Sequence, residues 1–459
     1  MADITIHPAS FKDPSGFVFH SGEKLYRQVN LSYAKEYDLL MNSGLYTELV
    51  RKEYLVTHKE VTGITALEEN WYKTIEPENI PFISYPYEWC FLQMRDAALL
   101  TLSILKIALS FGMIIKDATP YNIQFLKGKP VFIDTLSFDI YDPSRPWVAY
   151  RQFCNMFLFP LYLEFYLKSD IQKIMSAYLD GIPVDITSRM LPLKSGLNLG
   201  VWLHVYLQNK VMQTAKGKNE RDEFSTKKLL NLVHHLETII ISFSGREPKS
   251  EWSRYYQETI LGKDYLNEKE KIFTWLLDKV QANAALDLGA NDGFFPKIAA
   301  ARKMQVIAVD YDSRSVNNLY KEVKRSGIEN ILPLVIDISN PSPAIGFNNR
   351  ERASFHDRIR AELVIALALI HHLVIGKNIS LPVIAHYFAG IAPQLMIEWV
   401  PREDEKVQQM LASRKDVFQD YTEAHFELAF KKYFTIQEKI KVTGTHRLMY
   451  LMNSIKKAL

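Results

Sequence analysis

The order of apolar and polar positions predicts both strands and helices in the first part of the chain. Residues 16–29 alternate between apolar and polar side chains around a Ser-Gly-Glu-Lys turn, which favours an antiparallel hairpin. Residues 98–115 form a nearly continuous apolar run with Lys106 at its centre. A charge there would cost about 2.5–3.5 kcal/mol in a bilayer, so this run predicts a buried helix rather than a membrane span. Residues 123–126 and 131–134 are two short β-type runs around a Lys-Gly-Lys turn.

The middle of the chain predicts a helical core followed by a polar connection. Residues 151–207 are strongly apolar and aromatic, whereas residues 208–228 are the most polar segment and predict an exposed linker. Apolar side chains then recur at helical spacing from Leu229 to Ile240. A second polar break at residues 244–251 precedes another helical stretch.

Strand and helix patterns alternate regularly after Glu268, which is typical of a doubly wound α/β sheet with parallel strands. The predicted strands are five apolar runs at residues 284–288, 305–312, 332–339, 362–373 and 394–401. The last two β-type runs, residues 434–442 and 446–454, predict an antiparallel hairpin at the sheet edge.

The length of 459 residues exceeds what one ordinary hydrophobic core accommodates. We expect an α+β domain at residues 1–207, a linker and helical connector at 208–265, and an α/β, Rossmann-like domain at 266–459. The net charge of +3 gives no electrostatic footprint for a polyanion, so no nucleic-acid partner is expected. Two cysteines without disulfide or metal-site spacing, and an N-terminus unlike a signal peptide, favour a cytoplasmic setting.

Acids and glycines gather where the predicted strands of the second domain end. Gly289 and Gly293 follow the first strand, and glycine permits the close backbone approach that a nucleotide-like ligand needs. Asp287 is expected at the end of that strand. Asp310 ends the second strand and is placed to accept from ribose hydroxyls, a role that suits NAD equally well. Asp337 ends the third strand and is placed to accept from an adenine amino group.

The segments DLGANDGFF, VDYD, VIDIS and ALIHHL, in this order, resemble motifs of class I S-adenosyl-L-methionine (SAM)-dependent methyltransferases. The closing hairpin also favours this class over a dehydrogenase. Together with the amino-terminal half, the chain is similar to bacterial methyltransferases of the nodulation-protein type, a description that does not fix a substrate. The resemblance implies SAM as cofactor and eight SAM-binding residues: Asp287, Gly289, Asn291, Gly293, Asp310, Tyr311, Asp337 and Ile338.

Methyl transfer is an in-line displacement in which the enzyme aligns the acceptor and excludes water. A hydroxyl acceptor benefits from a general base, and histidine suits that role near neutral pH. His371 and His372 follow the fourth strand, on the side expected for the acceptor, although both could equally be structural. Glu398 is a candidate base or substrate-binding residue at the end of the fifth strand. No metal-ligand cluster stands out, so no metal is expected.

Five further residues of the second half carry weaker expectations. Arg402 and Asp404 are expected to be surface or loop charges. The aromatic residues before the second domain either cover the SAM end of the pocket or pack a helix: Trp252, Tyr256 and Tyr265.

The amino-terminal half carries Asp117, Pro120 and Asn122 at Asp-x-x-Pro-x-Asn spacing, with Asp134 following. This resembles the catalytic loop and metal-binding strand of protein kinases and aminoglycoside-type phosphotransferases. In those enzymes the first acid orients the acceptor hydroxyl, and the asparagine and second acid hold magnesium. The same residues could also simply cap a turn.

The departures from the phosphotransferase pattern disfavour phosphoryl transfer. No glycine-rich motif covers the phosphates, and Ile115 and Lys116 replace the usual residues before the catalytic acid. Asp134 is followed by Thr-Leu rather than Phe-Gly, and Arg27 is the candidate for the strand lysine. We therefore predict a kinase-like fold that has lost its chemistry.

Three hypotheses follow from the sequence. The first is a SAM-dependent methyltransferase that methylates an oxygen of a saccharide or small-molecule acceptor, with the kinase-like domain aiding substrate recognition. The second is a bifunctional methyltransferase and ATP-dependent kinase. The third is a non-catalytic SAM-binding module. The acceptor and the oligomeric state do not follow from the sequence.

Overall fold

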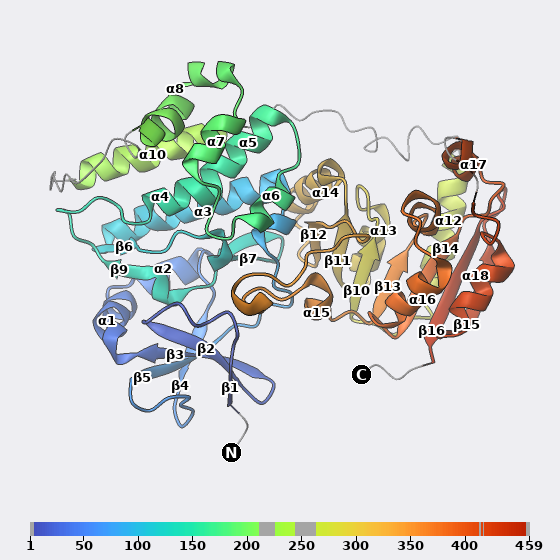
Figure 1. Cartoon of the computed structure of the whole chain (residues 1–459). Helices are drawn as coiled ribbons and strands as arrows, with labels where there is room; N and C mark the ends of the chain where they lie inside the picture. The colour runs from blue at the N-terminus through green and yellow to red at the C-terminus, as the bar shows by residue number, and fades with distance from the viewer. Residues whose placement is uncertain (1–3, 211–224, 244–262, 413–414, 416, 456–459) are drawn as a thin grey trace. The chain divides into compact units, whose positions relative to one another are not determined.

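The computed structural model describes residues 4–210, 225–243, 263–412, 415 and 417–455. The chain divides into two compact units (Figure 1). Unit 1 comprises Met1–Pro248 and Ala344–Ala353, and unit 2 comprises Lys249–Pro343 and Ser354–Leu459. Both units contain helices and strands, so the predicted mixed α/β class is confirmed.

Unit 1 begins with a five-stranded antiparallel sheet of order β1-β2-β3-β5-β4. The predicted hairpin is confirmed, because Gly16 is paired with Val29 across β2 and β3. A Cβ atom at Gly16 would lie 2.1 Å from the Gln28 carbonyl oxygen, so this position requires glycine. The strands are β1 (Ile4–Ile6), β2 (Gly16–Ser21), β3 (Lys24–Asn30), β4 (His58–Val61) and β5 (Trp71–Pro77).

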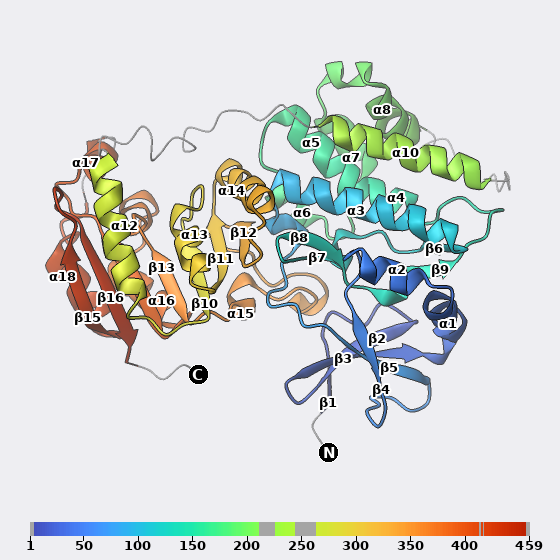
Figure 2. The same ribbon diagram turned by 180° about the vertical axis from the view of Figure 1, so that it is seen from behind.

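Helix α3 (Phe91–Ser110) is the central helix of the rest of unit 1 (Figure 2). The apolar run at residues 98–115 was predicted as one helix, but the structure ends the helix at Ser110 and starts strand β6 (Met113–Ile115). Gly112, with φ of +74°, makes the turn between them. The charge at the centre of the run is compensated, since Lys106 Nζ lies 2.6 Å from a carboxylate oxygen of Glu237 on α10 (Thr226–Ser242).

Two strand pairs and a set of short helices complete unit 1. Strand β6 pairs with β9 (Phe138–Ile140), and the predicted hairpin around Lys-Gly-Lys is formed by β7 (Ile123–Leu126) and β8 (Lys129–Phe132). The helical prediction for residues 151–207 is confirmed. The remaining helices are α1 (Ala34–Asn42), α2 (Leu45–Arg51), α4 (Tyr150–Phe153), α5 (Phe159–Leu167), α6 (Gln172–Ala177), α7 (Val184–Met190) and α8 (Leu199–Val201). Single helical turns are η2 (Pro86–Glu88), η3 (Pro120–Asn122), η4 (Thr135–Ser137), η5 (Cys154–Leu158), η6 (Leu193–Leu197) and η7 (Trp202–Leu207).

Unit 2 is built on a seven-stranded sheet of order β12-β11-β10-β13-β14-β16-β15. The first five strands in this order are parallel, whereas β16 runs antiparallel to β14 and β15. The predicted five-strand register and closing hairpin are therefore confirmed. The strands are β10 (Ala284–Leu288), β11 (Gln305–Asp310), β12 (Ile331–Val335), β13 (Leu363–Ala366), β14 (Gln394–Trp399), β15 (Phe434–Lys441) and β16 (Leu448–Ser454).

Four strands of unit 2 end before their predicted runs do, β11 and β14 by two residues each and β12 and β13 by more. Strand β12 ends at Val335 and β13 at Ala366, whereas the apolar runs continue to residues 339 and 373. The continuation of the second run forms a turn and a wide helical turn, η9 (His372–Gly376). An apolar run does not distinguish a buried strand from a buried turn of helix, which explains the difference.

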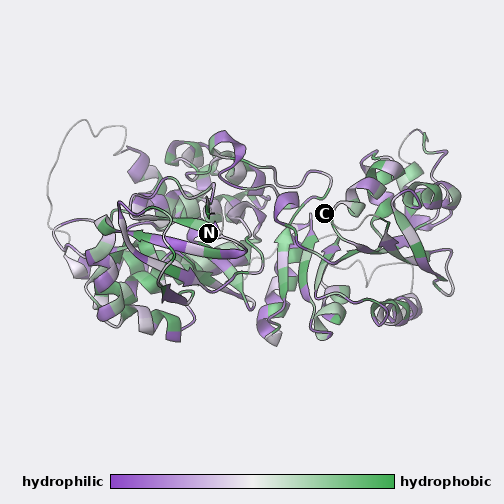
Figure 3. Cartoon of the chain, turned by 90° about the horizontal axis from the view of Figure 1, so that it is seen from below, coloured by the Kyte–Doolittle hydropathy of each residue, from purple (hydrophilic) through white to green (hydrophobic). Residues whose placement is uncertain are grey.

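The helices of unit 2 bury apolar side chains against the sheet. Phe273, Ala299 and Leu319 from three successive helices share one hydrophobic core with the central strands. In Figure 3 these parallel strands are largely green, which marks hydrophobic residues. The helices are α12 (Lys263–Leu277), α13 (Phe294–Ala301), α14 (Ser313–Ser326), α15 (Phe355–Arg358), α16 (Leu381–Ala389), α17 (Glu405–Ala412) and α18 (Glu423–Phe430).

The segment Ala344–Ala353 lies between β12 and α15 in the sequence but belongs to unit 1. The Glu351 side chain is buried and lies 2.7 Å from Lys12 Nζ. The Ala353 N–H donates to the Tyr85 hydroxyl at 3.1 Å, and the Arg352 guanidinium lies 4.2 Å from the centre of the Tyr121 ring. Unit 1 is therefore discontinuous in sequence.

None of the helices in the described ranges combines the length and the hydropathy that a membrane crossing requires.

Candidate functional site

Two acids of unit 2, Asp287 and Asp310, lie next to the turn that follows β10. Asp287 is buried within β10, beside Ala308 of β11 in the sheet. Asp310 ends β11, and its carboxylate accepts from the backbone N–H groups of Asn291 and Asp312, both at 2.9 Å. The side chain of Asp310 thus fixes the position of the glycine-containing turn that follows β10.

The conformation of this turn needs residues that tolerate positive φ. Gly289, Asn291 and Gly293 have φ of +78°, +49° and +81°. A Cβ atom at Gly293 would lie 2.2 Å from a methyl carbon of Leu319, so a larger residue would displace α13 from α14. The Asn291 side chain accepts from Ser315 Oγ at 3.1 Å.

Burial raises the pKa values of Asp287 and Asp310. Burial, with the nearby carboxylate of Asp310, raises the pKa of Asp287 to about 8. Burial also raises the pKa of Asp310 to about 6, against the backbone N–H groups that favour its charged form. A ligand that brings N–H or O–H donors to this edge would satisfy carboxylates that the free protein leaves in an unfavourable environment.

The third predicted acid lies just beyond β12. Asp337 accepts from the Ser339 N–H at 2.9 Å and from its hydroxyl at 2.5 Å, and Lys377 Nζ lies 3.3 Å away. Burial acts to raise the pKa of Asp337, but these partners outweigh it and hold the pKa below its ordinary value. Ile338 beside it is half-buried, and Tyr311 after β11 is 58% exposed.

The structure thus brings all eight predicted SAM-binding residues to one place. They lie at or just beyond the carboxyl ends of β10, β11 and β12, and these ends share one edge because the three strands are neighbours in the sheet and parallel.

The two candidate histidines come after β13, the strand on the other side of β10. The His371 side chain is fully buried, and both of its ring nitrogens lack a hydrogen-bond partner among the described residues. Its ring centre lies 4.2 Å from that of His372. Burial, with nearby cationic groups, holds the pKa of His371 well below its ordinary value. His371 is therefore a neutral imidazole, and its lowered pKa makes it a weaker base than a solvent-exposed histidine.

Glu398 is fully buried and compensated by cations. A carboxylate oxygen lies 2.6 Å from Lys269 Nζ, and the other accepts from the Tyr265 hydroxyl at 2.7 Å. Arg447 lies 3.5 Å away. Burial acts to raise the pKa of Glu398, but Lys269 and Arg447 outweigh it and lower the pKa. This arrangement favours a structural role for Glu398 over proton abstraction.

Arg447 connects this ion pair to Asp404. Its guanidinium donates to both carboxylate oxygens of Asp404, at 2.7 and 3.1 Å, and to the Tyr265 hydroxyl at 2.8 Å. Asp404 lies in the loop before α17, which agrees with the prediction of a surface or loop charge, but it is not a surface charge because its side chain is only 10% exposed. We call Tyr265, Lys269, Glu398, Asp404 and Arg447 the buried charge network.

Sequence reasoning missed Lys269 and Arg447. Lys269 lies four residues after Tyr265 and four before Phe273, on the buried face of α12. A lysine at that helical position is the signal that could have revealed it. Of the aromatic residues expected to precede the domain, Tyr265 belongs to the network, whereas Trp252 and Tyr256 lie outside the described residues.

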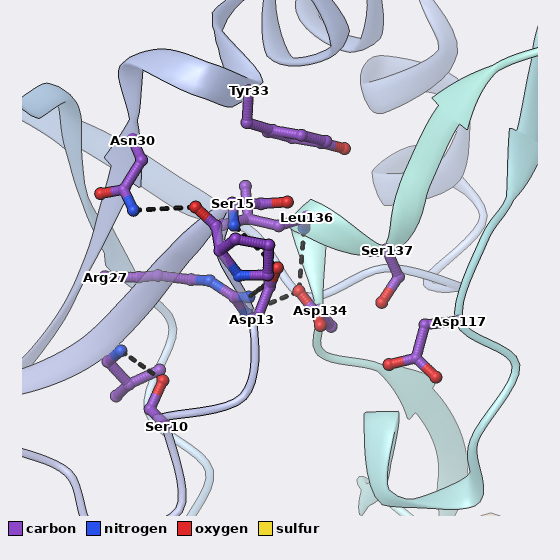
Figure 4. Close-up of polar contacts among 12 residues, drawn as sticks. Ser10, Asp13, Ser15, Arg27, Asn30, Tyr33, Asp117, Asp134, Leu136 and Ser137 are labelled. Atoms are coloured by element: carbon purple, nitrogen blue, oxygen red, sulfur yellow. Dashed lines mark hydrogen bonds and ion pairs between the residues drawn. The ribbon is translucent and has the colours of Figure 1, made fainter. Parts of the chain in front are cut away.

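In unit 1 the structure brings Asp117 close to Asn122 and to Asp134, and Figure 4 shows the two acids. The Asn122 amide donates to one carboxylate oxygen of Asp117 at 3.2 Å, and the Gln152 amide donates to the other at 2.5 Å. Burial, with the charge of Asp134, raises the pKa of Asp117.

Arg27 occupies the space beside the second acid. Its guanidinium lies 2.6 Å from a carboxylate oxygen of Asp134 and 3.3 Å from one of Asp13 (Figure 4). The same Asp134 oxygen accepts from the Leu136 N–H at 2.8 Å. Among the described residues, no group of three or more His, Cys, Asp or Glu side chains is arranged to hold a metal ion. An arginine therefore neutralises Asp134 where the phosphotransferase pattern would place magnesium.

The fold defines a doubly wound α/β unit closed by an antiparallel hairpin, joined to an α+β unit. No family model matches the chain. It is 29% identical over 452 residues to nodulation protein NoeA of Rhizobium meliloti (strain 1021), covering 96% of this chain and 94% of that protein.

Solved structures match parts of the chain at low sequence identity and low TM-score. The N-methyltransferase NodS from Bradyrhizobium japonicum WM9 is 12% identical, with a TM-score of 0.33, over 43% of this chain and 100% of that one. The bifunctional kinase-methyltransferase WbdD is 14% identical, with a TM-score of 0.28, over 43% of this chain and 39% of that one.

Proposed function

We propose that the chain is a SAM-dependent methyltransferase whose cofactor binds at the carboxyl edge of the unit 2 sheet. The observation that carries this proposal is the placement of three acids at the carboxyl ends of adjacent parallel strands: Asp287 near the end of β10, Asp310 at the end of β11 and Asp337 just beyond β12. SAM offers an α-amino group, ribose hydroxyls and an adenine amino group, all of which donate to carboxylates. Glycine at 289 and 293 permits the positive φ values of this turn, and the absence of a side chain at Gly289 would let a ligand approach the backbone closely.

SAM would supply an electrophilic methyl group on a sulfonium. The protein's own residues would hold and orient it: Asp287 toward the amino group, Asp310 toward the ribose and Asp337 toward adenine. Tyr265 is held by Glu398 and Arg447, which supports the proposal that it covers one end of this pocket.

For the acceptor, we propose a hydroxyl of a saccharide or another small molecule. The neutral ring of His371, which has no hydrogen-bond partner among the described residues, supports its role as the base that takes the hydroxyl proton. His372 lies beside it, with the two rings tilted by 37°, and would orient the ring. Similarity to a nodulation protein leaves the identity of the acceptor open.

For unit 1, we propose a role in recognising the acceptor rather than in phosphoryl transfer. The ion pair between Arg27 and Asp134 supports this choice over the bifunctional alternative, because it ties up the carboxylate that would hold magnesium.

The test is transfer of a labelled methyl group. The full-length protein is incubated with methyl-labelled SAM and fractionated bacterial glycans, metabolites and proteins. We expect label in a glycan or small-molecule fraction, and its loss in the His371→Ala/His372→Ala double variant. SAM binding without label in any fraction would instead support the non-catalytic binding module, and absence of SAM binding would refute the proposal.

A further inference from the structure

One end of unit 1 exposes a concentration of large apolar side chains. Leu193 and Leu197 on η6 are 95% and 91% exposed, and Leu199 at the start of α8 is 64% exposed. Trp202 follows at the start of η7 and is 47% exposed. We call these four residues the apolar tip.

The backbone beneath the apolar tip is well packed, so the exposure is a property of the fold. On the same turns, Ser195, Val201 and Val205 are fully buried. A Cβ atom at Gly200 would lie 2.7 Å from a methyl carbon of Ile239, which fixes α8 closely against α10. Within unit 1, α8 lies at the opposite end from the β1–β5 sheet (Figures 1 and 2).

The charge around the apolar tip has one sign. Residues 191–210 contain Lys194 and Lys210 but no aspartate or glutamate. Both lysines are exposed, and Lys194 follows Leu193 directly. An anionic surface would therefore attract residues 191–210, because this segment carries lysines and no carboxylate that would repel the surface.

The shape of the apolar tip selects among hydrophobic partners. Leucines that are more than nine-tenths exposed have almost no flanking side chains, so they project from the surface instead of lining a groove. A protein partner would need a matching hollow, whereas a bilayer accommodates projecting apolar side chains of any arrangement. Tryptophan is enriched at membrane interfaces, and lysine is attracted to anionic headgroups.

We propose that the apolar tip binds the surface of a phospholipid bilayer that contains anionic lipid. Leu193, Leu197 and Leu199 would enter the boundary between headgroups and acyl chains, with Trp202 at headgroup depth and Lys194 facing lipid phosphates. This binding is peripheral and independent of the methyl transfer proposed above.

The test is co-sedimentation of the full-length protein with vesicles. Phosphatidylcholine vesicles with 30% phosphatidylglycerol, an amount chosen for the assay, are compared with pure phosphatidylcholine vesicles. We expect the wild type to pellet with the anionic vesicles, and the Leu193→Glu/Leu197→Glu variant to bind at least about fivefold more weakly. A matched control is Leu67→Glu/Leu428→Glu, which adds the same two charges at leucines that are 53% and 62% exposed elsewhere.

Three results would overturn the proposal. The first is no pelleting of the wild type with anionic vesicles, and the second is equal binding by the two double variants. The third is a wild-type dimer, seen by sedimentation velocity without vesicles, that Leu193→Glu/Leu197→Glu converts to a monomer. That last result would assign the apolar tip to a contact between copies of the chain. Melting temperatures of both double variants near that of the wild type would exclude unfolding as the cause.

Discussion

Asp310 links the end of β11 to the turn after β10, so its replacement has two effects at once. Asp310→Ala removes the carboxylate that we propose accepts from the SAM ribose, and it releases the Asn291 N–H that shapes the turn. A charge-assisted hydrogen bond contributes about 1.5–3 kcal/mol, so we expect SAM binding to weaken by more than about tenfold in calorimetric titrations. Asp278→Ala is the control, because Asp278 pairs with Arg302 at the surface. Unchanged SAM affinity in Asp310→Ala would contradict the proposal that the end of β11 binds the ribose of SAM.

The charged form of Asp287 is expected to lower the stability of the free protein but to strengthen SAM binding. Its folded-state pKa of about 8 lies above the value of 3.8 expected in the unfolded chain. Between these values the folded protein holds a proton that the unfolded chain releases, so the stability of the free protein falls as the pH rises from about 4 to about 8.

Asp287→Asn cannot ionise in either state, so it removes this loss of stability. Each unit of pKa shift corresponds to about 1.4 kcal/mol, and we expect the variant to melt at least about 5 °C above the wild type at pH 8. The difference should shrink toward pH 4, while SAM affinity decreases. Thermal melts at both pH values check this, and a pH-independent difference would contradict it.

At the scale of elements, the packing of α13 on α14 depends on Gly293. Gly293→Ala places a methyl group in the left-handed region, which costs about 1–2 kcal/mol, and against Leu319, which adds about 1–3 kcal/mol. Gly327→Ala is the matched control, since its φ is +63° and no atom lies within 4 Å of the added methyl. Urea unfolding should show a larger loss for Gly293→Ala. Equal losses of unfolding free energy in the two variants would mean that the Leu319 side chain moves away from the added methyl group without destabilising the protein.

The buried charge network joins α12 to β14. Replacing one partner of a buried ion pair costs about 3–5 kcal/mol because the other charge remains unpaired, so Lys269→Met and Glu398→Met should each lower the free energy of unfolding by that amount. The double variant should lose less than the sum of the two. Urea unfolding of all three variants gives the coupling. Lys271→Met, which breaks an exposed pair with Glu268, should change the stability by less than about 1 kcal/mol.

At the scale of the whole molecule, we expect unit 2 to bind SAM and unit 1 not to bind ATP. We expect no magnesium-dependent binding of ATP in calorimetric titrations of the full-length protein, because Arg27 holds Asp134. Asp134→Ala should therefore leave the SAM affinity unchanged. Magnesium-dependent ATP binding that Asp134→Ala abolishes would instead establish the bifunctional enzyme.

The sequence predicts local features of this molecule better than distant contacts. Most strands of unit 2 are predictable because their apolar runs end near an acid or a glycine, as at Asp310 and Gly289, whereas the run of β13 continues without either and its end was misplaced. The proximity of Asp117, Asn122 and Asp134 was also foreseen, since their spacing follows a known motif. The buried charge network was not foreseen, because Arg447 and Asp404 are separated by a strand and two helices and only tertiary packing pairs them.

The discontinuity of unit 1 has a consequence for its biosynthesis. A ribosome releases the chain from its amino terminus, so residues up to Pro248 emerge before Ala344–Ala353, which complete the unit. Until then, Lys12 and Tyr85 lack the partners that Glu351 and Ala353 give them. Strands β10, β11 and β12 are translated in the interval. The first unit to be synthesised is thus finished only after half of the second has emerged, and a message truncated after Pro248 would encode an incomplete fold.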